Sequence, residues 1–144
     1  MLLDQPSKNE QCIRILARVD NRRVYKYIPS KYVIENEYLK FFNVVITEGN
    51  GTGAFGETLS TPVIIGPNDA VTDTFISIGR FTNKDEAIAL LKYIKTKFAR
   101  SLLSVKKATQ HTSRNVWVFV SMQDFSVNSD IDWTKPIFEI DHQL

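Results

Sequence analysis

The side chains best suited to chemistry in this chain of 144 residues are basic and short polar groups, and the chemistry that they favour is the binding of a polyanion. Arginine and lysine can neutralise phosphates, and asparagine or threonine beside glycine can approach a ligand closely. Such groups occur at a predicted turn, in a glycine-rich segment and around the predicted end of a helix. The candidates are Arg22, Arg23, Asn50, Thr52, Lys106, Lys107 and Arg114.

The charge distribution supports the same interpretation. The chain has 18 basic and 16 acidic side chains and a formal net charge of +2. Between positions 87 and 123 there is no acidic residue, whereas seven basic residues occur, and the rest of the chain holds 11 basic and 16 acidic side chains, or −5. Such a separation builds a positive field on one part of the surface, which favours a polyanion over a neutral small molecule.

The motifs that metal-dependent or nucleotide-dependent catalysis needs are missing from the sequence. His111, His142 and Cys12 cannot complete a four-ligand zinc site by themselves. No Asp or Glu precedes a Lys by two positions, as in many metal-dependent nucleases, and no two prolines are adjacent, as in adenine amino-methyltransferases. The glycine segment also lacks the Gly-Lys-Ser/Thr end of a P-loop. A serine or cysteine nucleophile stays open, because triad partners need not be close in the chain. We therefore predict a binding domain that is not an enzyme.

Each binding feature also has a purely structural interpretation. The segment 48–57 holds four of the six glycines and can be either a ligand loop or a flexible hairpin tip. The basic residues of the predicted helix spread over about 200° of its circumference, which is typical of a solvated face. Trp117, Phe119 and Trp133 are predicted core residues. The loop at 109–115 is the stronger candidate, because it places basic and polar groups next to the helix end.

Apolar side chains alternate with polar ones near the start of the chain, as in strands with one buried face. Two such runs, 13–19 and 23–28, flank Asp20-Asn21 and predict a hairpin with basic residues at its turn. A nearly continuous apolar run at 41–47 predicts a strand that is covered on both faces. Further strands are predicted at 61–66, 72–81 and 116–120, with a turn at 67–69.

A long amphipathic helix is predicted from about 83 to 107. Asn83 is its expected N-cap, with Asp85 and Glu86 in the first turn. Apolar residues recur at spacings of three and four, so one stripe packs on the sheet. Shorter helices are predicted at 31–39 and from Thr134 onward. The predicted fold class is α+β, with a mixed, mostly antiparallel sheet of about six strands packed against the one long helix, and a short C-terminal helix.

The chain is long enough to form a single core. We expect a polar N-terminal segment at 1–10 and one domain at 11–144, because 43% of the residues are hydrophobic. The start is polar, and no run of about 18 apolar residues is present to span a bilayer. The single cysteine excludes an internal disulfide and favours a reducing compartment. These features predict a cytoplasmic location.

Four segments resemble a known family. They are Gly-Glu-Thr-Leu-Ser-Thr-Pro at 56–62, Lys-Tyr-Ile-Lys-Thr-Lys-Phe-Ala-Arg at 92–100, Gln-Asp-Phe at 123–125 and Asp-Trp-Thr at 132–134. Together they are similar to the C-terminal specificity region of bacterial restriction-modification adenine methyltransferases, especially the single-chain type II enzymes that fuse methylation with cleavage. The chain departs from these relatives at Ser121, where they tend to have proline, and at Leu144, where they usually continue.

The resemblance implies sequence-specific recognition of double-stranded DNA by a target-recognition domain of a larger protein. The parent would supply the methyltransferase and nuclease domains, with S-adenosylmethionine and magnesium as their cofactors, and the domain itself would need none. Our leading hypothesis assigns the phosphates to the basic residues and the grooves to the loops at 48–57 and 109–115. Two alternatives are a module that docks a partner methyltransferase or nuclease domain, and a cryptic hydrolase.

Overall fold

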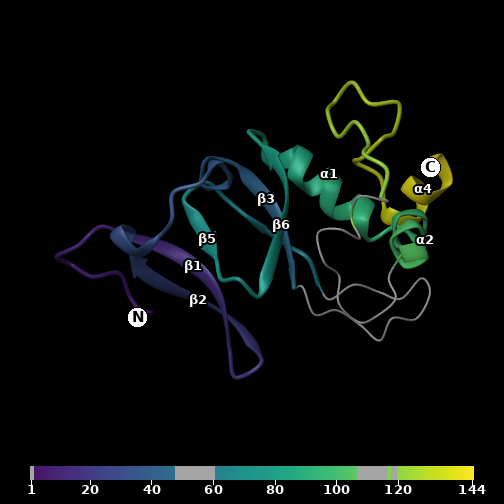
Figure 1. Ribbon diagram of the computed structural model, residues 1–144. Coiled ribbons are helices and arrows are strands. Elements are labelled where there is room, and N and C mark those ends of the chain that lie inside the picture. The colour runs from purple at the N-terminus through teal and green to yellow at the C-terminus, as the bar shows by residue number, and fades with distance from the viewer. Residues whose placement is uncertain (1, 48–60, 107–116, 118–119) are drawn as a thin grey trace.

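The computed structural model describes residues 2–47, 61–106, 117 and 120–144 (Figure 1). Its strands are β1 (Cys12–Val19), β2 (Arg22–Pro29), β3 (Phe42–Thr47), β4 (Val63–Ile65), β5 (Asp69–Val71) and β6 (Phe75–Phe81). Its helices are the 3-10 helices η1 (Ser30–Tyr32) and η2 (Glu37–Lys40), and the α-helices α1 (Lys84–Ile94), α2 (Lys97–Lys106) and α4 (Ile137–Gln143). The predicted α+β class is confirmed.

The predicted hairpin at the start of the chain is present. Asp20 and Asn21 form its two-residue turn, with left-handed φ angles of 48° and 64°. Positive φ at both central residues matches the twist of paired strands, and Asn and Asp accept this conformation more readily than most residues. The turn therefore fixes the register of β1 and β2, in which Val19 lies opposite Arg22 and Arg18 opposite Arg23.

The strands form two small sheets where the sequence predicts one sheet of about six strands. One sheet has the order β2-β1-β5 and the other the order β4-β3-β6. Every pairing is antiparallel except that of β1 with β5, so the mostly antiparallel character is confirmed and the single sheet is wrong. The two sheets and α1 follow one another as three packed layers (Figure 1).

The middle layer explains the continuous apolar run that predicts β3. Val44 and Ile46 belong to the cluster that packs β3 against α1, whereas Val45 packs with Leu16 and Phe75 between the two sheets. Both faces of β3 are therefore covered, as the sequence predicts.

A distant ion pair explains why the predicted strand at 72–81 begins too early. The chain turns at residues 66–69, where the Asp69 N–H donates to the Gly66 carbonyl at 3.2 Å. It then forms β5 at Asp69–Val71, before the position at which the sequence predicts the next strand. The Asp69 carboxylate receives two hydrogen bonds from the Arg14 guanidinium of β1, at 2.9 and 2.6 Å. These bonds hold β5 beside β1 in the first sheet, so that β6 begins only at Phe75 in the second sheet.

The predicted single helix at 83–107 is wrong, because the chain forms two helices separated at Lys95 and Thr96. The Thr96 hydroxyl donates to the Tyr93 carbonyl at 2.6 Å and accepts from the Ala99 N–H at 3.1 Å. The Asp141 carboxylate of α4 accepts from the first two N–H groups of α2, at 2.9 and 3.0 Å. Together these groups satisfy a new helix N-terminus in the middle of the amphipathic pattern.

The other predicted helix boundaries are partly correct. Asn83 is the N-cap of α1, since its side chain accepts from the Asp85 N–H at 2.8 Å. The predicted helix at 31–39 is present only as η1 and η2, and α4 begins at Ile137, after Pro136, rather than at Thr134. Of the predicted strand at 116–120 only Trp117 and Val120 are described. Trp117 is helical and the Val120 N–H donates to the Trp117 carbonyl at 3.0 Å, so neither residue is in a strand.

An aromatic cluster packs α1 against the segment that contains Phe125 and Trp133. Tyr93, Phe125 and Trp133 pack with ring centroids 5.1 to 6.0 Å apart, and Phe81 lies 6.0 Å from Phe125. The Trp133 indole N–H donates to the Asp124 carbonyl at 2.8 Å, and the Tyr93 hydroxyl donates to the Ser121 carbonyl at 2.7 Å. Trp133 is thus a core residue, as predicted. Among the described residues no helix is long and apolar enough to cross a membrane.

Candidate nucleic-acid interface

The hairpin turn gathers arginines at one end of the first sheet. We call Arg18, Asp20, Arg22 and Arg23 the hairpin tip, which projects at the bottom of Figure 1, away from α1 and α4. The two-residue turn sets Arg18 directly opposite Arg23 on one face, and Arg22 on the other face. Three positive charges and one negative charge therefore lie within a few residues of the turn.

Arg23 is anchored, whereas its neighbours are exposed. Its guanidinium donates to the Thr61 carbonyl and lies 5.9 Å from the centre of the Phe75 ring. Desolvation, and next the charge of Arg18, lower the pKa of Arg23 from its usual value. Arg18 and Arg22 are exposed to solvent, and they form no ion pair within the described part of the chain. They are the groups of the hairpin tip that a phosphate can reach.

Other basic residues of the hairpin are already neutralised. Arg14 pairs with Asp69 at 2.6 Å, and the hydrogen bond to that carboxylate raises the pKa of Arg14. Lys26 pairs with Asp4 of the N-terminal segment. These pairs leave the exposed positive charge of the hairpin concentrated at its tip rather than along its length.

The structure places three of the seven predicted site residues. Arg22 and Arg23 are adjacent at the start of β2, as predicted, and Lys106 is the last residue of α2. Asn50, Thr52, Lys107 and Arg114 lie outside the described residues, as do both predicted reading loops.

The sequence candidates do not include Arg18, which lies opposite Arg23 in the hairpin. The signal was present, because a two-residue turn at Asp20-Asn21 forces position 18 to face position 23.

Part of the acid-free segment at 87–123 is used for folding instead of for an exposed field. The Lys92 ammonium group donates to the backbone carbonyls of Trp133, Thr134 and Lys135, at 2.8, 3.2 and 3.2 Å. The Arg100 guanidinium donates to the Thr96 carbonyl at 3.3 Å. The formal charge of the segment therefore overstates what its surface offers to a ligand.

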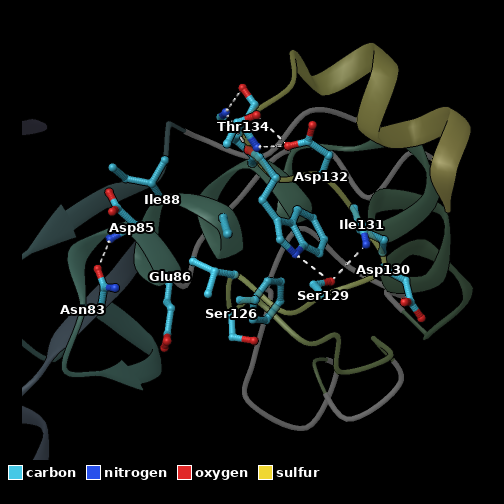
Figure 2. A pocket seen from close by; sticks show the side chains of 15 residues that line it. Asn83, Asp85, Glu86, Ile88, Ser126, Ser129, Asp130, Ile131, Asp132 and Thr134 are labelled. Carbon is cyan, nitrogen blue, oxygen red and sulfur yellow. Dashed lines mark hydrogen bonds between the residues drawn. The ribbon is translucent and has the colours of Figure 1, made fainter.

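One pocket formed by described residues has the opposite charge. Figure 2 shows this space of about 580 Å³ between the first turn of α1 and the segment 125–134. We call it the acidic pocket, because it is lined by the four carboxylates of Asp85, Glu86, Asp130 and Asp132. Its one lysine, Lys92, is bound to carbonyls, so the pocket repels a phosphate group. The described residues contain no group of three or more His, Cys, Asp or Glu side chains that could hold a metal ion.

Comparison with known proteins adds no family to this description. No protein-family model, no curated protein and no solved structure matches the chain.

Proposed function

We propose that the chain recognises double-stranded DNA and that the hairpin tip contacts the phosphate backbone. One observation carries the proposal, namely that a rigid two-residue turn holds exposed Arg18 and Arg22 beside the anchored Arg23. The sheet fixes the backbone that carries these arginines, and the planar guanidinium group of arginine matches the geometry of phosphate oxygens. The hairpin ion pairs of Arg14 and Lys26 support the proposal, because they confine the free positive charge to the tip.

The proposed role is that of the target-recognition domain of a type II restriction-modification enzyme that methylates adenine. The sequence segments that resemble this family carry this part of the proposal, together with the lack of the motifs for metal or nucleotide chemistry. Catalysis would then belong to the methyltransferase and nuclease domains of the parent, with S-adenosylmethionine and magnesium. Lys106, Lys107 and Arg114 would add phosphate contacts, and Asn50 and Thr52 would reach base edges, where one bidentate contact supplies about 1–3 kcal/mol of discrimination.

The experiment compares two double variants that lose the same charge. Arg18→Gln/Arg22→Gln removes the exposed arginines of the hairpin tip, and Lys8→Gln/Lys84→Gln removes two exposed lysines elsewhere. Binding to a labelled duplex is followed by fluorescence anisotropy between about 50 and 200 mM salt. We expect the tip variant to lower the slope of log K against log salt by about 0.9 for each lost phosphate contact, and the lysine variant to leave it nearly unchanged.

Two outcomes would contradict this assignment. Equal losses in both variants would show that net charge attracts the duplex without a defined contact at the tip. A wild-type chain that binds no duplex at low salt, but binds a methyltransferase domain tightly, would favour the docking module.

A further inference from the structure

The turn of the hairpin tip carries an exposed carboxylate between two exposed arginines. Asp20 is the first of the two turn residues, with a φ of 48°, and Arg18 and Arg22 lie on either side of it in the sequence. All three residues are exposed to solvent. The Asp20 side chain forms neither an ion pair nor a hydrogen bond with the residues that the structure describes. Its carboxylate is therefore open to an external partner.

The geometry of the turn does not require this carboxylate. Asparagine and glycine accept a left-handed φ at least as readily as aspartate, and Asn21 meets the same demand at φ 64° with a neutral amide. A negative charge at the end of the hairpin weakens the attraction of the hairpin tip for phosphates. A surface that contacts only phosphates would bind DNA more tightly with a neutral residue at position 20. The carboxylate is better matched to a hydrogen-bond donor on the nucleic acid.

The hairpin has the shape that brings its turn to the floor of a DNA groove. β5 pairs with residues 14–16 of β1, and the outer part of the hairpin, residues 17–24, continues beyond that pairing as two strands and their turn (Figure 1). Three residues of each strand extend about 10 Å at about 3.4 Å per residue. The major groove of DNA is about 8.5 Å deep and about 12 Å wide, and it admits a two-stranded ribbon.

The two arginines flank the carboxylate on opposite sides of this ribbon. Arg18 shares a face with Arg23, whereas Arg22 lies on the other face with Val24. A groove has a phosphate backbone along each side and the base edges at its floor. Arg18 and Arg22 can thus each contact one backbone, while Asp20 at the turn reaches past the phosphates to the bases.

The bases offer two kinds of donor to Asp20 in the major groove, the amino groups of cytosine and of adenine. The adenine amino group lies between two acceptors, N7 of the same base and O4 of the paired thymine, and both repel a carboxylate. The cytosine amino group lies at the end of the pattern of its base pair, with an acceptor on one side only, guanine O6. Aspartate therefore favours cytosine.

We infer that Asp20 reads a cytosine in the major groove by accepting a hydrogen bond from the amino group of that base. This contact rests on the proposed function, because it presupposes that the hairpin tip binds duplex DNA. It makes the hairpin tip a reader of sequence in addition to a phosphate contact.

Asp20→Asn tests the contact, because asparagine keeps the left-handed turn and removes the charge. Asp73→Asn is the matched control, since Asp73 is exposed and lies outside the hairpin. The wild-type chain and both variants first select duplexes from a pool with a randomised core. Fluorescence anisotropy then measures the affinity of each chain for the wild-type consensus and for the same duplex with one C·G pair at a time replaced by A·T.

We expect the wild type to require cytosine at one position, where A·T weakens binding at least about fivefold, the low end of the cost of one mismatched pair. Asp20→Asn should bind these two duplexes equally or prefer adenine, since an asparagine amide matches the N6 and N7 atoms of adenine. Asp73→Asn should keep the preference of the wild type.

The results also separate this contact from the proposed function. If Asp20→Asn binds every duplex more tightly and keeps each preference of the wild type, Asp20 reads no base, and the phosphate contacts of the hairpin tip stand. Duplex binding by the wild type without a required cytosine would overturn the base contact alone. A wild type that binds no duplex at low salt would overturn both.

Discussion

The hairpin tip and the acidic pocket hold their charges in opposite ways. At the hairpin tip, Arg18 and Arg22 are exposed at the end of a two-stranded projection (Figure 1). At the acidic pocket, two of the carboxylates belong to the first turn of α1 and two to the segment 125–134 (Figure 2). The Lys92 ammonium group of α1 donates to the Trp133 carbonyl of that segment. The first arrangement leaves charge available to a partner, and the second uses charge to hold two parts of the chain together.

The difference teaches that the charge of a sequence segment and the charge of a surface are separate quantities. The acid-free segment at 87–123 is the most basic part of the sequence, yet its Lys92 lines an acidic pocket and is bound to carbonyls. The hairpin tip has fewer basic residues, but two of them, Arg18 and Arg22, are exposed to solvent. A search for a polyanion site from sequence must therefore weigh where each charge is already bound.

Among the changes to these two regions, removal of the Lys92 ammonium group should lower the free energy of unfolding the most. Lys92→Ala leaves three carbonyls of the segment 133–135 without their donor. Hydrogen bonds to charged groups contribute about 1.5–3 kcal/mol, and we expect a loss of this size in the free energy of unfolding, measured with urea. Lys84→Ala is the matched control, because Lys84 is exposed in the same helix, and its effect should stay within about 0.5 kcal/mol. Equal effects of the two variants would show that the hydrogen bonds of Lys92 do not stabilise the packing of the segment 133–135 on α1.

The turn of the hairpin tip offers a smaller and more selective change. Asn21 has a left-handed φ of 64°, which costs alanine about 1 kcal/mol more than it costs glycine. We expect Asn21→Ala to lower the free energy of unfolding by about this amount and Asn21→Gly to change it by a few tenths. Both variants keep every arginine, so a loss of DNA affinity in Asn21→Ala alone would report on the geometry of the tip. Equal affinities would mean that charge alone matters there.

Local pattern predicted the elements that local chemistry determines. The turn at Asp20-Asn21, the buried strand β3 and the N-cap Asn83 are all properties of neighbouring residues, and all three are confirmed. The errors come from partners distant in sequence. Arg14 holds Asp69 across 55 positions, and Asp141 begins α2 from 44 positions away, so no window of the sequence contains the reason for two sheets or for two helices.

The candidate site was predictable to a similar extent. The turn placed Arg22 and Arg23 correctly, because a hairpin turn is a local feature. The acidic pocket was not predicted, since it forms where the first turn of α1 meets residues 125–134.

The smallest expected effect is a pH dependence at the acidic pocket. The Asp132 carboxylate accepts from the Thr134 hydroxyl and N–H at 2.5 and 3.0 Å, and these bonds lower the pKa of Asp132. A carboxyl group with a lower pKa in the folded state stabilises the fold above its ordinary value of about 3.9, and this contribution is lost as the pH falls through the folded pKa. Carboxyl NMR titration should therefore find the pKa of Asp132 below that ordinary value.

Two variants test the cause of this pKa. In urea unfolding, Asp132→Asn should weaken the decline in the free energy of unfolding below about pH 4. Thr134→Val keeps the carboxylate and should raise the pKa of Asp132 toward its ordinary value. If Asp132 titrates in Thr134→Val as it does in the wild type, the hydrogen bonds from Thr134 are not the cause of its lowered pKa.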